Sequence, residues 1–263
     1  MIIFIVPVYN EAQNIVNLLA RTHGEMAHNG LPYKMIVVND GSTDGTEKKV
    51  ESLMGKFNIE ICSHYPNKGV GEAFRVGFAR AVAIAGDSDI IVTKEGDNTS
   101  DLKILSKLIS KINDGYDLVL ASCYAKEGAV LDAPLLRRIL SRAANMLLAL
   151  CIGIKGVHTY SSFYRAYSAR SLKEMLSIYD GRLIEQDGFE CMVELLIKFG
   201  RHKKFKIAEV PMTLDGSRRV GRSKMRILKT IKGFVRVILK HGMLYRVKQI
   251  FKKIRGGPSY EFK

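Results

Sequence analysis

Cysteine and histidine are sparse in this sequence, and their spacing disfavours two kinds of site. The four cysteines are Cys62, Cys123, Cys151 and Cys191, and no two of them form a C-x-x-C motif. A disulfide-stabilised scaffold and a thiolate zinc site are therefore poorly supported, and a reducing compartment fits best. None of the six histidines forms an H-x-H or H-x-x-x-H pair, which disfavours a histidine-rich metal centre.

The chain also lacks a long apolar run. No segment reaches the roughly 18–20 consecutive apolar residues that a membrane-spanning helix needs. The apolar start, residues 1–8, has no basic stretch before it and polar residues directly after it, so we expect a buried strand rather than a signal peptide. With 263 residues, 47% of them hydrophobic and 25% charged, the chain is long enough to bury a large core.

Acidic residues are rare in the last 63 residues, which hold 19 Lys+Arg and 3 Asp+Glu. Because the net charge of the whole chain is +15, the basic excess lies in this segment. Such an asymmetry favours an anionic partner, namely nucleic acid, a membrane surface or phosphate. The plainer alternative is a solvated basic tail.

Strand and helix patterns alternate over the first 120 residues. We predict strands at 2–8, 34–39, 58–63, 89–93 and 116–122, with helices at 11–27, 43–55, 71–85 and 102–112. This alternation predicts an α/β fold with a doubly wound, mostly parallel sheet and helices on both faces. The second half is predicted to add helices at 134–150 and 188–199, a strand at 205–211 and a long C-terminal helix. We expect one catalytic domain, residues 1–224, and an extension, 225–263.

Polar clusters follow three of the predicted strands, at 9–11, 39–42 and 95–98. Ligands of doubly wound sheets bind at the carboxyl ends of the strands, so the three clusters are expected on one rim. Glu95 and Asp97 are two residues apart, and both carboxylates can turn toward a divalent cation, Mg²⁺ or Mn²⁺, bound to a diphosphate. Taken alone, an acidic turn after a strand is more often a solvated loop.

Asp40, at the end of the second strand, is placed like the acid that binds a ribose or base in dinucleotide sites. A dehydrogenase is nevertheless a poor fit, because no G-x-G-x-x-G follows the first strand. The segment Gly41–Asp44 is also explained as a turn that caps the next helix through Ser42 or Thr43.

Four motifs together resemble family-2 glycosyltransferases, which have a GT-A fold. They are Pro7-Val-Tyr-Asn-Glu11, Val38-Asn-Asp-Gly-Ser-Thr-Asp44, Asn67-Lys-Gly-Val-Gly71 and Glu95-Gly-Asp97. A later pair, Glu209-Val-Pro-Met212 and Arg218-Arg-Val-Gly-Arg-Ser-Lys224, is similar to the ending of the dolichol-phosphate or polyprenyl-phosphate mannose and glucose synthase branch. The resemblance covers roughly residues 1–225, and it is the combination of motifs that is specific.

The resemblance implies a role for each matched residue. Pro7, Tyr9, Glu11 and Asp40 would hold the nucleoside of the donor, and Glu95 and Asp97 would hold the metal, with Asp97 the more direct ligand. Arg219, Ser223 and Lys224 would face phosphate groups, and Asp97, Arg219 and Lys224 would act in catalysis. Arginine suits this role because it binds phosphate in a bidentate way, whereas lysine acts as a point charge.

Three positions depart from the family pattern. Glu95 stands where Asp is common, and Thr99 stands where the polyprenyl branch often has Gln. The stretch His158-Thr-Tyr-Ser-Ser-Phe-Tyr-Arg165 lacks the acid of the family's D-x-x-S-G-F-R and contains an extra Tyr164. His158 is either a base or, as histidines more often are, a structural residue.

The acceptor decides whether a base is needed. A phosphate monoester has a second pKa near about 6 and is already an anionic nucleophile at neutral pH. The enzyme then only aligns the reactants and neutralises the leaving diphosphate. A hydroxyl acceptor requires a carboxylate base, for which Glu185-Gln-Asp187 is the candidate, although it also reads as a polar helix start.

The region 225–240 is a basic amphipathic helix by its spacing. Apolar residues recur at helical intervals and Lys229, Lys232, Arg236 and Lys240 fill the opposite stripe, and the pattern repeats after Gly242. Such a pair of helices lies flat on anionic lipid, so we expect a peripheral protein on the cytoplasmic face of a membrane, with helix 134–150 joining the contact. Alternatively, the apolar faces pack on the catalytic domain.

The leading hypothesis is a metal-dependent inverting transferase that moves a hexose from GDP-mannose or UDP-glucose to a polyprenyl or dolichyl phosphate. One alternative is transfer to a hydroxyl of a glycan or glycolipid. Another is a noncatalytic nucleotide-binding partner subunit. A nucleic-acid-binding protein is not expected, because the bulky residues of the tail are aliphatic rather than aromatics interleaved for stacking.

Overall fold

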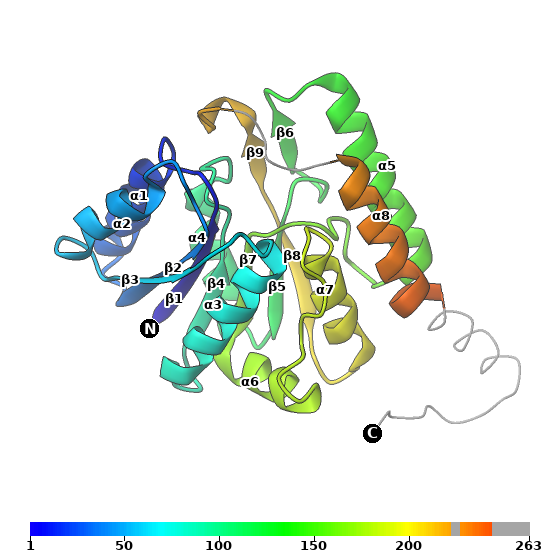
Figure 1. Cartoon of the computed structure of the whole chain (residues 1–263). Coiled ribbons are helices and arrows are strands. Elements are labelled where there is room, and N and C mark those ends of the chain that lie inside the picture. Colours follow the sequence, from blue (N-terminus) through cyan, green and yellow to red (C-terminus); the bar gives the residue numbers. More distant parts are fainter. Residues whose placement is uncertain (222–226, 244–263) are drawn as a thin grey trace, which may run out of the picture.

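The computed structural model describes residues 1–221 and 227–243. Seven strands form the central sheet in the spatial order β3-β2-β1-β4-β7-β5-β8 (Figure 1). Their bounds are Ile2–Val8 (β1), Tyr33–Asp40 (β2), Ile59–His64 (β3), Ile90–Thr93 (β4), Leu118–Ser122 (β5), Arg165–Ser168 (β7) and Ile207–Pro211 (β8). Every neighbouring pair is parallel except the two pairs that β7 makes. The predicted mostly parallel α/β sheet is confirmed.

The antiparallel strand β7 lies between β4 and β5. It has four residues, starts at a charged one and ends at a polar one, so it shows neither a long apolar run nor a clean alternation. The helix after it, α6 (Ala169–Ile178), begins where the Ser168 hydroxyl accepts a hydrogen bond from the N–H of Ser171. The sequence patterns predict neither of these elements.

Helices cover both faces of the sheet because its strands are apolar on both sides. Alternate residues of β1 enter different cores: Ile3 and Ile5 pack on one face, Phe4 and Val6 on the other. The first core includes residues of α3 (Val70–Ile84), α6 and α7 (Cys191–Arg201). The second includes residues of α1 (Ile15–His28), α2 (Thr46–Met54) and α4 (Leu105–Asn113), which follows the 3-10 turn Leu102–Ile104.

The start of α2 differs from the prediction. The helix begins at Thr46, and its N-cap residue is Gly45, whose φ of +85° lies in the left-handed region that favours glycine. Ser42 and Thr43 do not cap it. They lie outside the helix and bond to Asn10 of the first motif instead. The Ser42 hydroxyl and the Thr43 N–H thus connect two loops and do not start a helix.

The second half of the chain adds elements outside the central sheet. A small parallel sheet pairs β6 (Ala129–Leu131) with β9 (Thr213–Asp215), which leads into the 3-10 turn η2 (Gly216–Arg218). The predicted helix 134–150 is observed as α5 (Leu135–Ile152), and the long basic helix as α8 (Ile227–Val237), continued by the π-helical segment η3 (Ile238–Met243). The predicted domain boundary at 224/225 and the amphipathic repeat after 243 lie outside the described residues.

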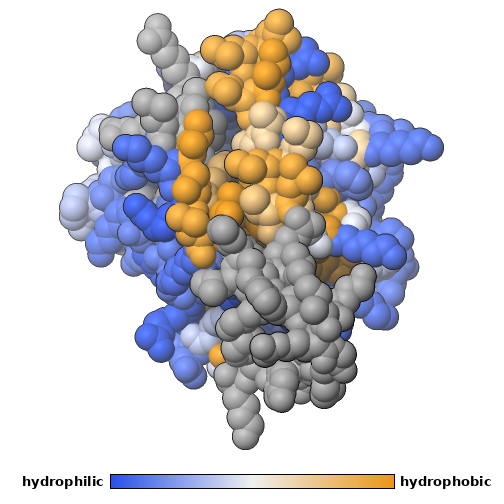
Figure 2. All heavy atoms as spheres, turned by 90° about the vertical axis from the view of Figure 1, so that its right-hand side faces the viewer, coloured by the Kyte–Doolittle hydropathy of each residue, from blue (hydrophilic) through white to orange (hydrophobic). Residues whose placement is uncertain are grey.

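One face of the molecule is apolar over α5, α8 and η3, and we call it the α5/α8 surface (Figure 2). Side chains of α8 and η3 divide between two environments: Val237 and Ile238 are buried, whereas Ile231, Val235 and Leu239 are exposed. The exposed apolar residues of α5 are Leu135, Leu136, Ile139, Leu140, Met146, Leu147 and Leu150. One stripe of the basic helix therefore packs on the domain, as the alternative expected, and another is uncovered, while contact with a membrane stays a prediction. Among the described residues, no helix has the length and hydropathy to cross a bilayer.

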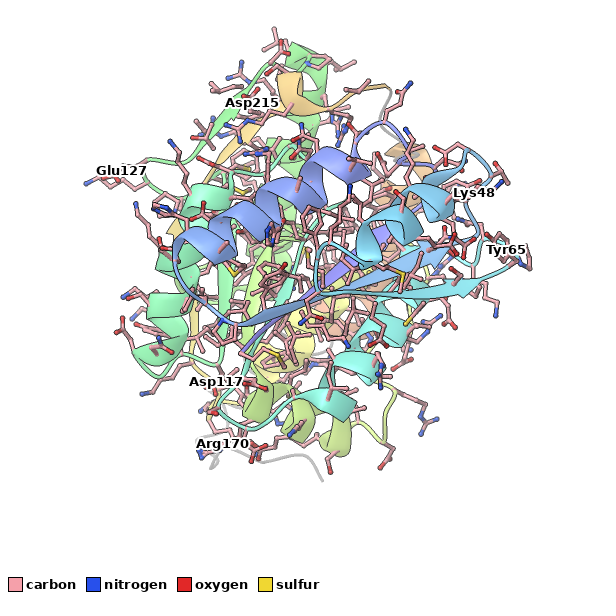
Figure 3. All side chains as sticks on the ribbon, turned by 90° about the vertical axis from the view of Figure 1, so that its left-hand side faces the viewer. Lys48, Tyr65, Asp117, Glu127, Arg170 and Asp215 are labelled. Atoms are coloured by element: carbon pink, nitrogen blue, oxygen red, sulfur yellow. The ribbon has the colours of Figure 1, made fainter. Side chains whose placement is uncertain are left out.

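The carboxyl ends of the parallel strands define a rim at one end of the molecule. Figure 3 shows Asp215 at this end and Asp117 and Arg170 at the opposite end. Because β5 starts directly after Asp117 and runs parallel to β8, which leads into β9, its carboxyl end lies toward Asp215. The polar clusters that follow β1, β2 and β4 are therefore on one rim, as predicted.

Candidate active site at the sheet rim

The first two motif loops are locked together by hydrogen bonds between side chains and backbone. Three consecutive N–H groups donate to the second loop: Asn10 N to Ser42 Oγ at 2.9 Å, Glu11 N to Thr46 Oγ1 at 2.9 Å and Ala12 N to Asp44 Oδ2 at 3.0 Å. In return, Thr43 N donates to Asn10 Oδ1 at 2.8 Å. The hydrogen bonds from Thr46 and Ala12 outweigh the effect of burial and lower the pKa of Asp44, so this carboxylate stays ionised. The two motifs form one rigid loop pair.

The acidic loop after β4 is shaped by its own hydroxyls. Thr99 donates to Asp97 Oδ1 from its backbone N at 3.1 Å and from its hydroxyl at 2.8 Å, and Ser100 Oγ donates to Glu95 Oε2 at 2.8 Å. A Cβ on Gly96 would lie 3.1 Å from the carbonyl oxygen of Pro7, so glycine allows this loop to approach β1 closely. The loop is thereby placed next to the first motif.

The buried residue Lys94 contacts the same loop from the protein interior. Its side chain is 1% exposed, its Nζ donates to the carbonyl oxygen of Ser100 at 3.2 Å, and it lies 4.3 Å from the ring centroid of Tyr164. Burial lowers the pKa of Lys94 to about 8, partly opposed by Glu95. The Lys94 side chain is therefore held against this loop, close enough to Glu95 for the two charges to interact.

Arg219 is the centre of the arrangement. Its guanidinium forms an ion pair with Asp97 Oδ2, and Glu11 and Glu95 are close enough to raise its pKa, although burial has the larger effect and lowers it. The side chain is only 17% exposed. Carboxylates from the first and fourth motifs thus surround a cation from the C-terminal motif, and the pair of Arg219 and Asp97 spans 122 residues of sequence.

Asn14 fixes the loop that carries Arg219. Its amide donates to the Val220 carbonyl oxygen at 3.0 Å and accepts from Val220 N at 2.8 Å, and it also donates to Glu11 Oε2 at 2.7 Å. Asn14 is 3% exposed. Asn14 is not among the predicted site residues, although its position three residues after Glu11 and directly before an apolar helix is a signal for such a role.

Asp40 reaches the rim, but its carboxylate is turned into the third motif. It accepts hydrogen bonds from Asn67 Nδ2 at 2.8 Å, Lys68 N at 2.8 Å and Gly69 N at 3.0 Å, and it lies 2.7 Å from His64 Nε2. With 3% of its surface exposed, Asp40 shapes the 67–69 loop. Its predicted direct contact with a nucleoside stays a prediction.

The remaining predicted residues divide into three groups. Tyr9 is on the rim with 38% of its surface exposed, and Pro7 is buried in β1 beneath the acidic loop. Glu11, Glu95, Asp97 and Arg219 are brought together. Ser223 and Lys224 lie outside the described residues, so their predicted contacts with phosphate stay predictions.

The candidate bases for a hydroxyl acceptor are already paired. Asp187 accepts from Arg75 at 2.5 Å, and Glu185 forms ion pairs with Lys198 at 3.1 Å and with Lys240. Lys240 has the largest effect in lowering the pKa of Glu185 to about 2. The segment 185–187 is not a helix start, because α7 begins only at Cys191.

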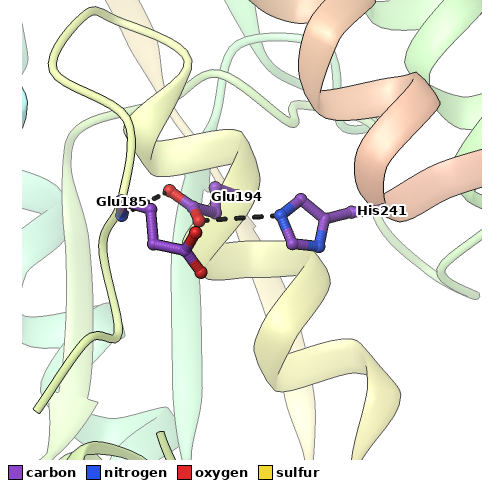
Figure 4. Close-up of side chains that lie close together, drawn as sticks. All are labelled: Glu185, Glu194 and His241. Atoms are coloured by element: carbon purple, nitrogen blue, oxygen red, sulfur yellow. Dashed lines mark hydrogen bonds and ion pairs between the residues drawn. The ribbon is translucent and has the colours of Figure 1, made fainter.

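A second acidic cluster lies behind the 185–187 segment (Figure 4). Glu185, Glu194 and His241 offer three ligand atoms within 4.8 Å of one another. Lys198 is 3.0 Å from Glu194 and also neutralises Glu185, and burial lowers the pKa of His241 to about 4. A divalent cation would have to displace buried Lys198, so we assign the cluster to the packing of η3 on α7.

The donor set on the rim suits a hard divalent cation. Asp97 and Glu95 provide carboxylate oxygens, and Thr99 and Ser100 add hydroxyls, which are ligand types of Mg²⁺ and Mn²⁺. Arg219 pairs with Asp97 Oδ2, but its side chain is 17% exposed and can make room for a metal ion, unlike that of Lys198, which is 1% exposed. The residues therefore fit the predicted metal, and that Asp97 and Glu95 are its ligands stays a prediction.

The sequence profile of glycosyl transferase family 2 matches residues 3–176. The chain is 31% identical to a dolichol-phosphate mannosyltransferase of Pyrococcus furiosus over 237 residues, which are 90% of this chain and 62% of that protein. It is 28% identical to a polyprenol monophosphomannose synthase of Mycolicibacterium smegmatis, over 84% of this chain and 79% of that protein. The chain thus spans less than two thirds of the Pyrococcus protein.

Solved structures show the same fold. Glucosyl-3-phosphoglycerate synthase from Mycobacterium tuberculosis, in complex with Mn²⁺, UDP and glucosyl-3-phosphoglycerate, aligns with a TM-score of 0.62 at 22% identity, over 91% of this chain and 77% of that one. Its complex with Mg²⁺ and UDP aligns with a TM-score of 0.64 at 21% identity, over 92% and 79%. The predicted GT-A fold is confirmed by this likeness.

Proposed function

The chain belongs to glycosyl transferase family 2, and from this premise we propose that it moves a hexose from a nucleotide-diphosphate sugar to a polyprenyl or dolichyl phosphate. The observation that carries the proposal is the convergence of Glu11, Glu95 and Asp97 on Arg219 at the sheet rim. Acids and a cation in this arrangement suit a metal-bound diphosphate. GDP-mannose and UDP-glucose are both candidate donors.

Different residues of the rim are proposed to bind the nucleoside, the metal ion and the phosphate groups. Tyr9 and the loops held by Asp44 and Asp40 form the side on which the nucleoside binds. Asp97 and Glu95 hold the divalent ion, which supplies charge neutralisation for the leaving diphosphate when bound. Arg219 then contacts phosphate oxygens, and Ser223 and Lys224 are proposed to do the same. Asn14 keeps Arg219 in place through Val220.

The acceptor is proposed to be a phosphate rather than a hydroxyl. A phosphate monoester is an anion at neutral pH and attacks without a base. Transfer to a hydroxyl needs an available carboxylate, whereas Glu185 and Asp187 are engaged in ion pairs with lysine and arginine. The reaction therefore proceeds by direct displacement with inversion at the sugar, with alignment as the main task of the protein.

The α5/α8 surface is proposed to lie on an anionic membrane, on its cytoplasmic face. Its exposed aliphatic residues are bordered by exposed Arg138 and Arg142 of α5 and by Lys232 and Arg236 of α8. Apolar area inserts into the headgroup boundary, and each basic residue near the surface adds about 1 kcal/mol of attraction. A lipid acceptor would reach the protein from this side.

The proposed reaction is tested by donor binding followed by transfer. We expect calorimetry to show that either GDP or UDP binds the full chain in the presence of Mn²⁺, and at least about tenfold more weakly with a chelator, because the diphosphate then loses its counter-charge. With the matching sugar nucleotide, polyprenyl phosphate should be glycosylated. Polyprenol, the same lipid with a hydroxyl, is the matched control and should not react. Binding of neither nucleotide, or preferential transfer to polyprenol, contradicts the proposal.

Membrane binding is tested with two charge insertions in the α5/α8 surface. The variant Leu136→Glu/Ile139→Glu should bind vesicles containing anionic lipid at least tenfold more weakly in sedimentation, because it loses apolar insertion and adds repulsion. The matched control is Met54→Glu, at an exposed apolar position of α2, and should bind like wild type. Equal binding of all three proteins contradicts the assignment of this surface.

A further inference from the structure

His158 and Glu209 form a pair at the rim that the proposed mechanism does not use. The ring atom Nδ1 of His158 lies 3.0 Å from Glu209 Oε2, and Glu209 Oε1 accepts from His158 N at 2.8 Å and Thr159 N at 2.7 Å. The Glu209 side chain is 4% exposed, whereas that of His158 is 60% exposed. The buried carboxylate of Glu209 thus makes all three of these hydrogen bonds to the exposed His158 and its neighbour Thr159.

The pair fixes which atom of the ring faces outward. An ionised carboxylate only accepts hydrogen bonds, so Nδ1 is the donor and the second bond to the backbone prevents the ring from turning away. The remaining nitrogen, Nε2, is on the opposite side of the ring and therefore faces solvent. A histidine that served only to anchor the segment would not need this exposure, because the two backbone N–H groups already do so.

The pair is close to the acidic loop of the candidate site. Thr159 Oγ1 lies 2.6 Å from Ser122 Oγ at the carboxyl end of β5. Cys123 follows directly, and although burial is the main cause that raises the pKa of its thiol to about 11, Glu209 and Glu95 both add to the rise. The thiol of Cys123, after the end of β5, thus interacts electrostatically with Glu209 of the pair and with Glu95 of the acidic loop.

The pair also adjoins the α5/α8 surface. His158 belongs to the segment that connects the end of α5 to the start of β7. On the same side, the Arg142 guanidinium of α5 lies 5.8 Å from the ring centroid of Tyr124, whose N–H donates to Thr159 Oγ1 at 3.4 Å. His158 therefore belongs to the segment that joins α5 to the strands of the rim, and Arg142 is linked to this segment through Tyr124.

We propose that His158, oriented by Glu209, binds the phosphate group of the lipid acceptor and so determines its placement against the donor. The inference rests on the proposed function. A lipid phosphate whose chain lies on the α5/α8 surface has to bring its head group past this segment to reach the rim. In the imidazolium form both ring nitrogens are donors, so the outward Nε2 donates to a phosphate oxygen while Nδ1 stays bonded to Glu209, and Arg142 adds positive charge to this side of the protein. Glu209 acts as a positioning residue.

The test compares kinetic constants for the two substrates in the full chain. In His158→Ala the KM for polyprenyl phosphate should rise about tenfold, because one hydrogen bond to a charged group is lost, while the KM for the sugar nucleotide stays within twofold. His158→Gln retains a side-chain N–H donor and should recover part of the loss. His28→Ala, at an exposed position of α1, is the matched control and should leave both constants unchanged.

The variant Glu209→Gln tests whether Glu209 acts by positioning the His158 ring. It should raise the KM for polyprenyl phosphate like His158→Ala, and the double variant should add little more, because both changes remove one oriented ring. A wild-type chain that never glycosylates polyprenyl phosphate contradicts the proposed function itself. Transfer by wild type with an unchanged acceptor KM in His158→Ala contradicts only the role of His158, as does an equal loss of affinity for donor and acceptor.

Discussion

Asp97→Asn is expected to lower kcat/KM by about 10²- to 10³-fold. A bound divalent ion contributes several kcal/mol of charge stabilisation to the transition state, and asparagine removes the charge that holds the ion. The change is nearly isosteric, so the hydrogen bond from the Thr99 hydroxyl to the side-chain oxygen can persist. We expect the melting temperature to stay close to that of wild type and nucleotide binding to lose its dependence on Mn²⁺.

The matched control is Asp101→Asn, four residues further along the same loop. Asp101 accepts from Lys103 N at 3.1 Å and lies 3.7 Å from Arg218, but it belongs to the start of a 3-10 turn and not to the carboxylates around Arg219. Its activity should stay within about threefold of wild type, because loss of an exposed ion pair has a small effect. If Asp97→Asn retained similar activity with an unchanged metal requirement, the metal role of Asp97 would be wrong.

Arg165→Met is expected to reduce the free energy of unfolding by about 3–5 kcal/mol. Arg165 is fully buried, and its guanidinium donates to three backbone carbonyl oxygens: Ser162 O at 2.7 Å, Met192 O at 2.8 Å and Tyr160 O at 2.9 Å. Methionine fills most of the volume but leaves these acceptors without donors, each at a desolvation cost of about 1–3 kcal/mol. In a domain of this size the melting temperature should fall by roughly 10 °C.

Arg170→Met provides the comparison, because Arg170 is exposed at the start of the next helix, α6. A surface substitution there should change the unfolding free energy by no more than about 0.5 kcal/mol. Urea titration of both variants gives the difference directly, with an unchanged slope if the denatured state is the same. A loss below about 1 kcal/mol in Arg165→Met would show that the three carbonyl groups find other donors.

The parts of the fold that short-range patterns determine were predictable. The apolar runs of β1, β2, β4 and β5, each followed by a helical period, indicate a parallel sheet covered on both faces, because strands buried on both sides have no polar alternation. From this alone, the acids after β1 and β4 could be placed on one rim. Arg219 was placed there only through the motif that resembles a known family.

The parts that depend on distant partners were not predictable. Whether β7 pairs antiparallel with β4 and β5 is decided by contacts across the sheet, and its four residues carry no signal of their own. Asp40 has the residue type and position of a nucleoside ligand, but its carboxylate bonds to a loop about 28 residues later. Ser42 and Thr43 look like helix caps, yet the N–H of Asn10 and its side-chain oxygen are nearer partners than the helix.

The two hydrogen bonds between Asn14 and Val220 join positions 206 residues apart. During synthesis the first motif leaves the ribosome early, but the loop that carries Arg219 is made only after almost the whole sheet. A nascent chain that ends before this loop has the carboxylates of the rim without the arginine between them, and like charges held together repel one another. The rim therefore acquires its electrostatic balance only late in synthesis, and a shortened chain that ends before residue 219 should carry an acidic rim.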